Sequence, residues 1–178
     1  MKKNKIYIFI VVLFAALFVS CSEDDLNSES VITEAQRVEN DFDRWIVKHY
    51  VTPYNIDFKY RMEDIESDRD YNLIPADYTK SVQLAKLVEF LCLNVYDEVT
   101  GSKEFIRDYF PKMIHLVGSP AYDEGQITLG TAEGGLKVTL YNVNTLDPHN
   151  PDIEVLNFWY FKTMHHEFTH ILHQTVEF

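Results

Sequence analysis

Residues 159–174 read WYFKTMHHEFTHILHQ, and this stretch decides the fold that the sequence predicts. Apolar side chains recur through it at helical spacing, among them Phe161, Phe168 and Ile171. We therefore predict a helix from about Asp152 onward that packs one face against a core. No glycine, proline or polar tail follows, so the helix is expected to run to the last residue and the protein to continue beyond it.

Within this helix lies the motif His166-Glu167-x-x-His170. Residues four apart on a helix share one face and lie about 6 Å apart along the axis, so both imidazoles can reach one Zn²⁺ ion at about 2.0–2.1 Å. Glu167 is the next residue round the helix, about 100° away. There its carboxylate can take a proton from zinc-bound water and pass it to a leaving group. The apolar neighbours predict a core-facing zinc site, and the motif predicts a hydrolase.

The third zinc ligand is open between two candidates. His173 lies on the same face as His166 and His170, but three imidazoles would then have to converge over about 10 Å of helix axis. In zinc enzymes whose third ligand comes from a later element, that carboxylate or histidine would lie beyond Phe178. His165 is expected to point elsewhere on the helix. Three further histidines belong to no motif and are expected to be structural or exposed: His49, His115 and His149.

Helices and strands are mixed in the rest of the sequence, which predicts an α+β fold. The expected helices span residues 33–48, 78–99, 103–110 and the stretch from 152 onward, and the expected strands span residues 54–62, 113–117, 126–131 and 136–143. Together with the motif, this order predicts a zincin-like fold, with helices packed on a small mixed or antiparallel sheet and the HExxH helix at the C-terminal end. Residues 136–143 are either an edge strand that pairs with an extended substrate, as in zincins, or an internal strand.

Composition excludes several classes of protein. The protein has 178 residues with 16 Lys and Arg against 28 Asp and Glu, a net charge of −12. So acidic a surface repels phosphate backbones, and we expect no nucleic-acid partner. The only two cysteines are Cys21 and Cys92, which excludes a disulfide scaffold and a cysteine-based metal cluster.

The first twenty residues have the layout of a secretory signal. Lysines precede an apolar run over residues 6–19, and a serine then stands directly before Cys21. The serine–cysteine pair resembles a lipobox, in which Cys21 becomes the lipidated N-terminus; an ordinary cleaved signal is the alternative. Residues 21–32 are predicted to be an acidic flexible tether. This tether resembles the surface-export signal of Bacteroidota lipoproteins, which implies a cell-surface position on the outer membrane, with the periplasmic side as the alternative.

Four stretches together resemble a known family: the lipobox with its tether, the helix HHEFTHILHQ, and the segments WIVKHYVTPYNIDFKYRM at 45–62 and LGTAEGGLKVTLYNVNTLD at 129–147. They are similar to the substrate import-associated zinc metallohydrolase lipoproteins of Bacteroidota, a family of zinc metallopeptidases. The resemblance covers Cys21 to the end and implies a domain over residues 33–178 that lacks its C-terminal part. By position it implies zinc on His166 and His170 and a general base at Glu167.

Two functions of different kind follow. The first is a surface metallopeptidase that acts on peptides or glycoproteins beside an outer-membrane nutrient receptor complex; a non-peptide amide or ester is a weaker candidate for its substrate. The second is a non-catalytic, zinc-containing lipoprotein subunit of an import complex, with a closed zinc site and no open water position. The present chain alone is expected to be inactive if half of its site is missing.

Overall fold

The computed structural model describes residues 39–63, 70–123, 126–128, 130–133, 135–150 and 152–176. The predicted signal, the lipidation site at Cys21, the acidic tether and residues 33–38 of the first expected helix lie outside these residues. No described helix is long and apolar enough to cross a membrane.

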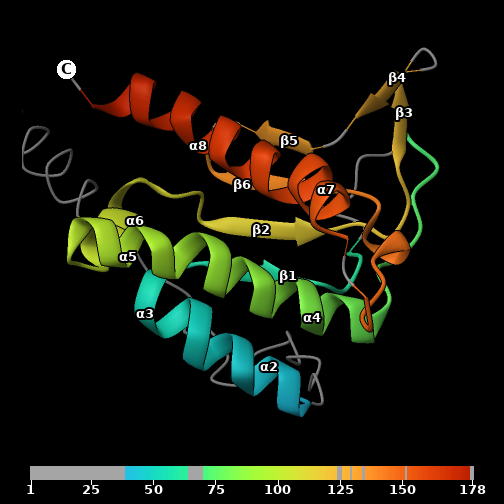
Figure 1. Ribbon diagram of the computed structural model, residues 1–178, viewed down its shortest axis with the longest axis horizontal. Coiled ribbons are helices and arrows are strands. Elements are labelled where there is room, and N and C mark those ends of the chain that lie inside the picture. Colours follow the sequence, from blue (N-terminus) through green and yellow to red (C-terminus); the bar gives the residue numbers. More distant parts are fainter. Residues whose placement is uncertain are drawn as a thin grey trace, which may run out of the picture. The chain divides into compact units, whose positions relative to one another are not determined.

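A four-stranded mixed sheet forms the scaffold (Figure 1). Its order is β1 (Asp57–Lys59), β2 (Met113–Leu116), β6 (Lys137–Leu140) and β5 (Gly130–Glu133). The first three strands are parallel, and β5 pairs antiparallel with β6. A separate two-stranded antiparallel ribbon is formed by β3 (Ala121–Asp123) and β4 (Gln126–Thr128).

The sheet confirms the predicted α+β class and corrects two strand predictions. The strand expected over 126–131 is two strands, β4 and β5, which belong to different sheets. The strand expected over 136–143 ends at Leu140, because Asn142 adopts a left-handed conformation with φ 65° and a 3₁₀ turn, η3 (Val143–Thr145), follows. It is also internal, since β6 lies between β2 and β5. Among the described strands, the edges of this sheet are β1 and β5.

Residues 54–62, which were expected to form one strand, show alternating burial of their side chains. Tyr54, Ile56, Phe58 and Tyr60 are all buried. Only β1 pairs as a strand, however, because Tyr54 still belongs to the preceding helix. Phe58 lies in register with Ile114 of β2 and therefore shares its face of the sheet.

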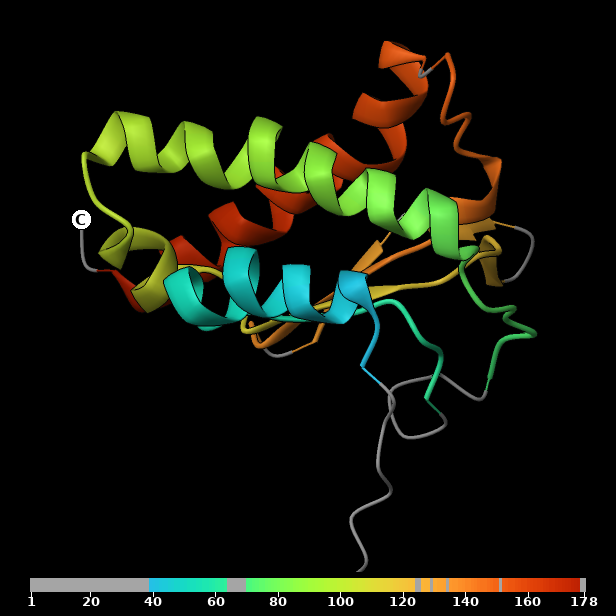
Figure 2. The same cartoon turned by 90° about the horizontal axis from the view of Figure 1, so that it is seen from below.

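Three long helices supply much of the rest of the core, and each contains a five-residue π-helical stretch. The first comprises α2 (Asp41–Ile46), η1 (Val47–Val51) and α3 (Thr52–Tyr54). The second comprises α4 (Tyr78–Val88), η2 (Glu89–Leu93) and α5 (Asn94–Thr100). The third comprises α7 (Ile153–Leu156), η4 (Asn157–Phe161) and α8 (Lys162–Thr175). In Figure 1 the second helix runs below β2, with α8 above both and α2 below; Figure 2 shows the same elements from below.

The π-helical stretch η2 changes which side chains of the second helix are buried. The helix spans residues 78–100 and ends at Gly101 with φ 70°, as predicted. Leu91 and Val95 are apolar and yet exposed, whereas Leu93 is fully buried. A π-helical turn holds one residue more than an α-helical turn, so the side chains after it are shifted round the helix by one position. The short helix α6 (Glu104–Tyr109) follows, with Ser102 Oγ accepting from the Glu104 N–H.

The first described helix begins with a capping box. The Asn40 side chain accepts from the Asp43 N–H, and the Asp43 carboxylate accepts from the Asn40 N–H, each at 2.9 Å. Arg61 also donates two hydrogen bonds to this carboxylate, at 2.8 and 2.9 Å. Burial alone would raise the pKa of Asp43, but the hydrogen bonds from Arg61, Asn40 and Tyr60 outweigh it, so the pKa lies below the ordinary value of 3.8.

We expect Asp43→Asn to lower the free energy of unfolding by about 1 kcal/mol at pH 7, through loss of the cap and the ion pair. A carboxylate whose folded-state pKa is depressed stabilises the fold above its unfolded pKa, and this contribution is lost as pH falls through the folded pKa. The difference from wild type should therefore shrink below about pH 4. Urea unfolding at pH 7 and pH 3 measures it, with the exposed Asp41→Asn as control; an equal loss at both pH values would contradict the assignment.

Candidate metal centre

The helix α8 has one buried face, which fixes how the helix is rotated on the core. Phe168 is fully buried, and its ring packs edge-on against three aromatic rings from α5 and the α6 segment, with centroid distances of 5.0–5.7 Å: Tyr96, Phe105 and Phe110. Met164 and Ile171 are buried on the same side. The helix ends at Thr175, and Val176 is extended, so the predicted run to the last residue is not found.

The histidines of the motif lie on the opposite, exposed face of α8. The expectation of a core-facing site was wrong, because the buried stripe is filled by apolar side chains and leaves His166 and His170 outside it. Their Nε2 atoms nevertheless point at each other, 3.0 Å apart, with the ring planes at 89°. Two ligands of a tetrahedral Zn²⁺ ion at about 2.0–2.1 Å are themselves about 3.3 Å apart. The pair thus fits a shared zinc ion after a movement of a few tenths of an ångström.

A surface hollow of about 410 Å³ lies over this pair. Besides His166 and His170, its lining consists of Asn157, Lys162, His165, Thr169 and His173. His173 thus lies on the same face of α8 as the pair. Within the described part of the protein, no three His, Cys, Asp or Glu side chains gather as a group that could hold a metal.

Glu167 does not line the hollow but lies beside it, half-buried. Ile171, one turn further along α8, packs against Gly135, with its Cγ1 3.4 Å from where a Cβ of residue 135 would be. Residues four apart share a helix face, and α8 packs beside β5. Glu167 therefore lies on the side of α8 that faces the β5–β6 hairpin, next to the histidine pair.

His165 differs from its prediction, because it lines the same hollow instead of pointing elsewhere. Its Nδ1 lies 2.8 Å from the hydroxyl of Tyr96 on α5. Burial lowers the pKa of His165. Burial and the neighbouring Cys92 raise the pKa of Tyr96 to about 12, which keeps the phenol protonated. The contact fixes the His165 ring between α5 and the hollow.

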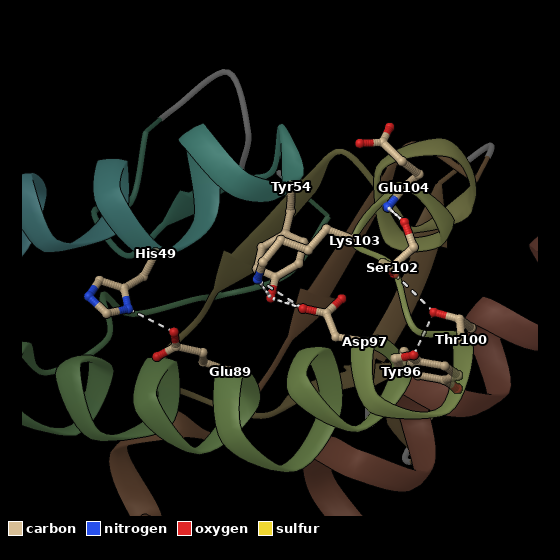
Figure 3. Close-up of polar contacts among 9 residues, drawn as sticks. All are labelled: His49, Tyr54, Glu89, Tyr96, Asp97, Thr100, Ser102, Lys103 and Glu104. Atoms are coloured by element: carbon tan, nitrogen blue, oxygen red, sulfur yellow. Dashed lines mark hydrogen bonds and ion pairs between the residues drawn. The ribbon is translucent and has the colours of Figure 1, made fainter.

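The α5 helix that carries Tyr96 is itself anchored by a polar cluster (Figure 3). Asp97 accepts a hydrogen bond from Tyr54 at 2.6 Å and pairs with Lys103 at 2.9 Å. Lys103 also donates to the Tyr54 hydroxyl, at 2.7 Å. The cluster joins the end of α3 to α5 and the start of α6, which holds the neighbouring Tyr96 in place.

The remaining histidines have other surroundings. His49 pairs with Glu89 at 2.7 Å, as Figure 3 shows, and its ring stacks on Trp45 with centroids 4.3 Å apart. His115 is buried on β2, and His149 is exposed. This agrees with the prediction that the three are structural or exposed. The sequence did not single out Tyr96 or Lys162; Lys162 could have been found, since it precedes His166 by four residues.

Comparison with known proteins identifies the family of the chain. The model of a family described as "Putative zinc-binding metallo-peptidase" matches residues 34–178. The chain belongs to this family. A solved structure described as a putative zinc-binding metallo-peptidase from Bacteroides caccae shares 54% sequence identity, with a TM-score of 0.64. The match covers 84% of this chain and 56% of that one, so the chain spans little more than half of its relative. No curated protein matches.

The description of the family as zinc-binding agrees with the zinc site that the motif predicts. The description also agrees with the resemblance given above, in which the similar family is one of zinc metallopeptidases.

Proposed function

We propose that this protein is a zincin-like metallopeptidase of the HExxH type, with His166 and His170 as zinc ligands and Glu167 as general base. The observation that carries the proposal is the convergence of the two Nε2 atoms, 3.0 Å apart on one exposed helix face. The family supports zinc as the metal. Imidazole nitrogen is a preferred zinc ligand, and an open coordination position is what distinguishes catalytic from structural zinc sites.

The protein's own residues supply the proton transfer. When bound, zinc lowers the pKa of water and makes a nucleophile available near neutral pH. Glu167, beside the pair on the hairpin side, accepts a proton from the attacking water and delivers it to the leaving amine. Glu167 is half-buried and lies beside the hollow without lining it.

The edge strand β5 is our candidate for binding the peptide backbone. Within the described residues β5 pairs only with β6, so its outer edge can add an extended substrate by main-chain hydrogen bonds. It is antiparallel to β6 and lies beside α8. A peptide on this edge would pass next to Glu167. The substrate-binding role that was considered for residues 136–143 is therefore assigned to β5 instead.

The third ligand stays a choice between His173, which lines the same hollow, and a residue that follows Phe178.

We further propose the lipidation of Cys21, the cell-surface position on the outer membrane and the association with a nutrient receptor complex. They are supported by the sequence of residues 1–32. Shaving intact cells with an external protease tests the position: loss of the protein supports the cell surface, and protection supports the periplasmic side.

Metal removal tests the proposed activity. Full-length protein should contain about one zinc ion per molecule, lose peptide cleavage after treatment with a chelator, and regain it when zinc is added back. Metal analysis and cleavage of a peptide library, read by mass spectrometry, measure the two properties. Stoichiometric zinc without any cleavage would support the non-catalytic subunit instead, and absence of zinc would contradict both functions.

A further inference from the structure

The hollow over the histidine pair has an unusual charge for this protein. The sequence holds 28 acidic against 16 basic residues, yet no Asp or Glu is among the described residues that line the hollow. Lys162 brings a positive charge to it, and the side-chain amide of Asn157 can donate hydrogen bonds. An anionic group is therefore attracted to this hollow, while the acidic surface elsewhere repels it.

Lys162 is placed to hold such a group close to the reacting bond. It precedes His166 by four residues, so it lies one helical turn, about 6 Å, from that ligand on the same face. Two other described lysines are paired with carboxylates, Lys103 with Asp97 and Lys59 with Asp57. Lys162 has no carboxylate partner within the described ranges, and its side chain is exposed at the hollow.

His165 adds a second polar group on the same side. It follows Lys162 by three residues, which makes the two side chains neighbours on the helix. The hydroxyl of Tyr96 lies 2.8 Å from the Nδ1 of His165. Since the ring also lines the hollow, its remaining nitrogen is the one available to a bound molecule.

We infer that the hollow binds a carboxylate of the substrate and that Lys162 is the residue that selects it. The inference rests on the proposed function and deepens it by naming the substrate class. One residue of an extended peptide spans about 3.4 Å, so the carboxylate lies within two residues of the scissile bond. It belongs either to an acidic side chain or to the free carboxyl terminus of the peptide.

A binding experiment tests the inference without turnover. Zinc-loaded, full-length Glu167→Gln protein is titrated with fluorescent peptide pairs that differ only in Asp against Asn, or in a free against an amidated C-terminus. We expect the carboxylate member of one pair to bind roughly fivefold to tenfold more tightly, and the advantage to fall with added salt. The pair that shows it tells an acidic side chain from a peptide terminus.

Variants of Lys162 then show whether this lysine is responsible. Lys162→Gln should remove the preference, Lys162→Arg should keep it, and Lys162→Glu should favour a matched peptide with Lys in place of Asp. The exposed Lys48→Gln changes the net charge equally and should leave the preference intact. Zinc content and thermal unfolding are measured for each variant. Equal binding of both members of every pair, a preference that survives Lys162→Gln, or no binding of any peptide at millimolar concentration would overturn the inference.

Kinetics separate this inference from the proposed function. In the active protein, Lys162→Gln should raise KM for carboxylate peptides roughly fivefold to tenfold, with kcat and the KM for neutral peptides within about twofold. Cleavage without a carboxylate preference would overturn the inference and leave the peptidase standing. A carboxylate preference in binding, without cleavage of any peptide, would overturn the peptidase and leave the anion site standing.

Discussion

Replacing Glu167 by glutamine is expected to lower kcat for peptide cleavage by about a thousandfold and to leave zinc content unchanged. General acid–base catalysis by a positioned carboxylate contributes roughly 10²–10⁴ in rate, and an amide of the same shape accepts no proton. Glu167 lies outside the hollow that contains the two histidines, so its loss removes no metal ligand. Steady-state kinetics on a cleaved peptide and metal analysis of the same sample measure both effects.

Glu154→Gln is the matched control, because it makes the same chemical change at an exposed position in the first turn of α7. It should leave kcat within about twofold. If the Glu167→Gln protein cleaved at the wild-type rate, Glu167 would not be the general base, whatever the zinc content of the variant.

Replacing His170 by alanine has the second large effect: we expect the affinity for zinc to fall by roughly a hundredfold to a thousandfold. Structural four-ligand zinc sites bind with about 10–16 kcal/mol, so one ligand accounts for a few kcal/mol of binding. The side chain of His170 is exposed, and its removal should therefore change the free energy of unfolding of the metal-free protein little. Competition with a chromogenic zinc chelator measures the affinity.

His173→Ala decides the question of the third ligand in the same assay. A loss comparable to that of His170→Ala would make His173 a ligand, and an unchanged affinity would leave the third position to another side chain. His149→Ala, an exposed histidine in the loop before α7, is the control. Wild-type affinity in the His170→Ala protein would contradict the proposed centre.

Local patterns predicted those elements whose signal lies within a few residues. The second helix was predicted correctly because its stop signal, Gly101, adopts a left-handed conformation that favours glycine. The buried alternation around Phe58 was visible for the same reason, since a period of two is a property of the strand itself. Strand partners are set by distant residues, and the sequence therefore did not show that β5 is an edge strand while residues 137–140 are internal.

The site was predictable to the same extent. The spacing of His166 and His170 gives a shared helix face from geometry alone, and the structure shows their nitrogens converging. Their exposure was not predictable, since it depends on how the ring of Phe168 packs against α5 and α6. Tyr96 lies 69 residues before His165, and no local pattern connects them.

The π-helical stretch η4 makes the direction of the histidine pair sensitive to the number of residues before it. Deleting one residue within Asn157–Phe161 would let the helix wind as a regular α-helix, which advances by about 100° per residue. With α7 held in place, His166 and His170 would swing away from the solvent side of the domain. Insertions and deletions in this segment should thus be far less tolerated than substitutions, because the segment sets the helical phase of every side chain that follows it.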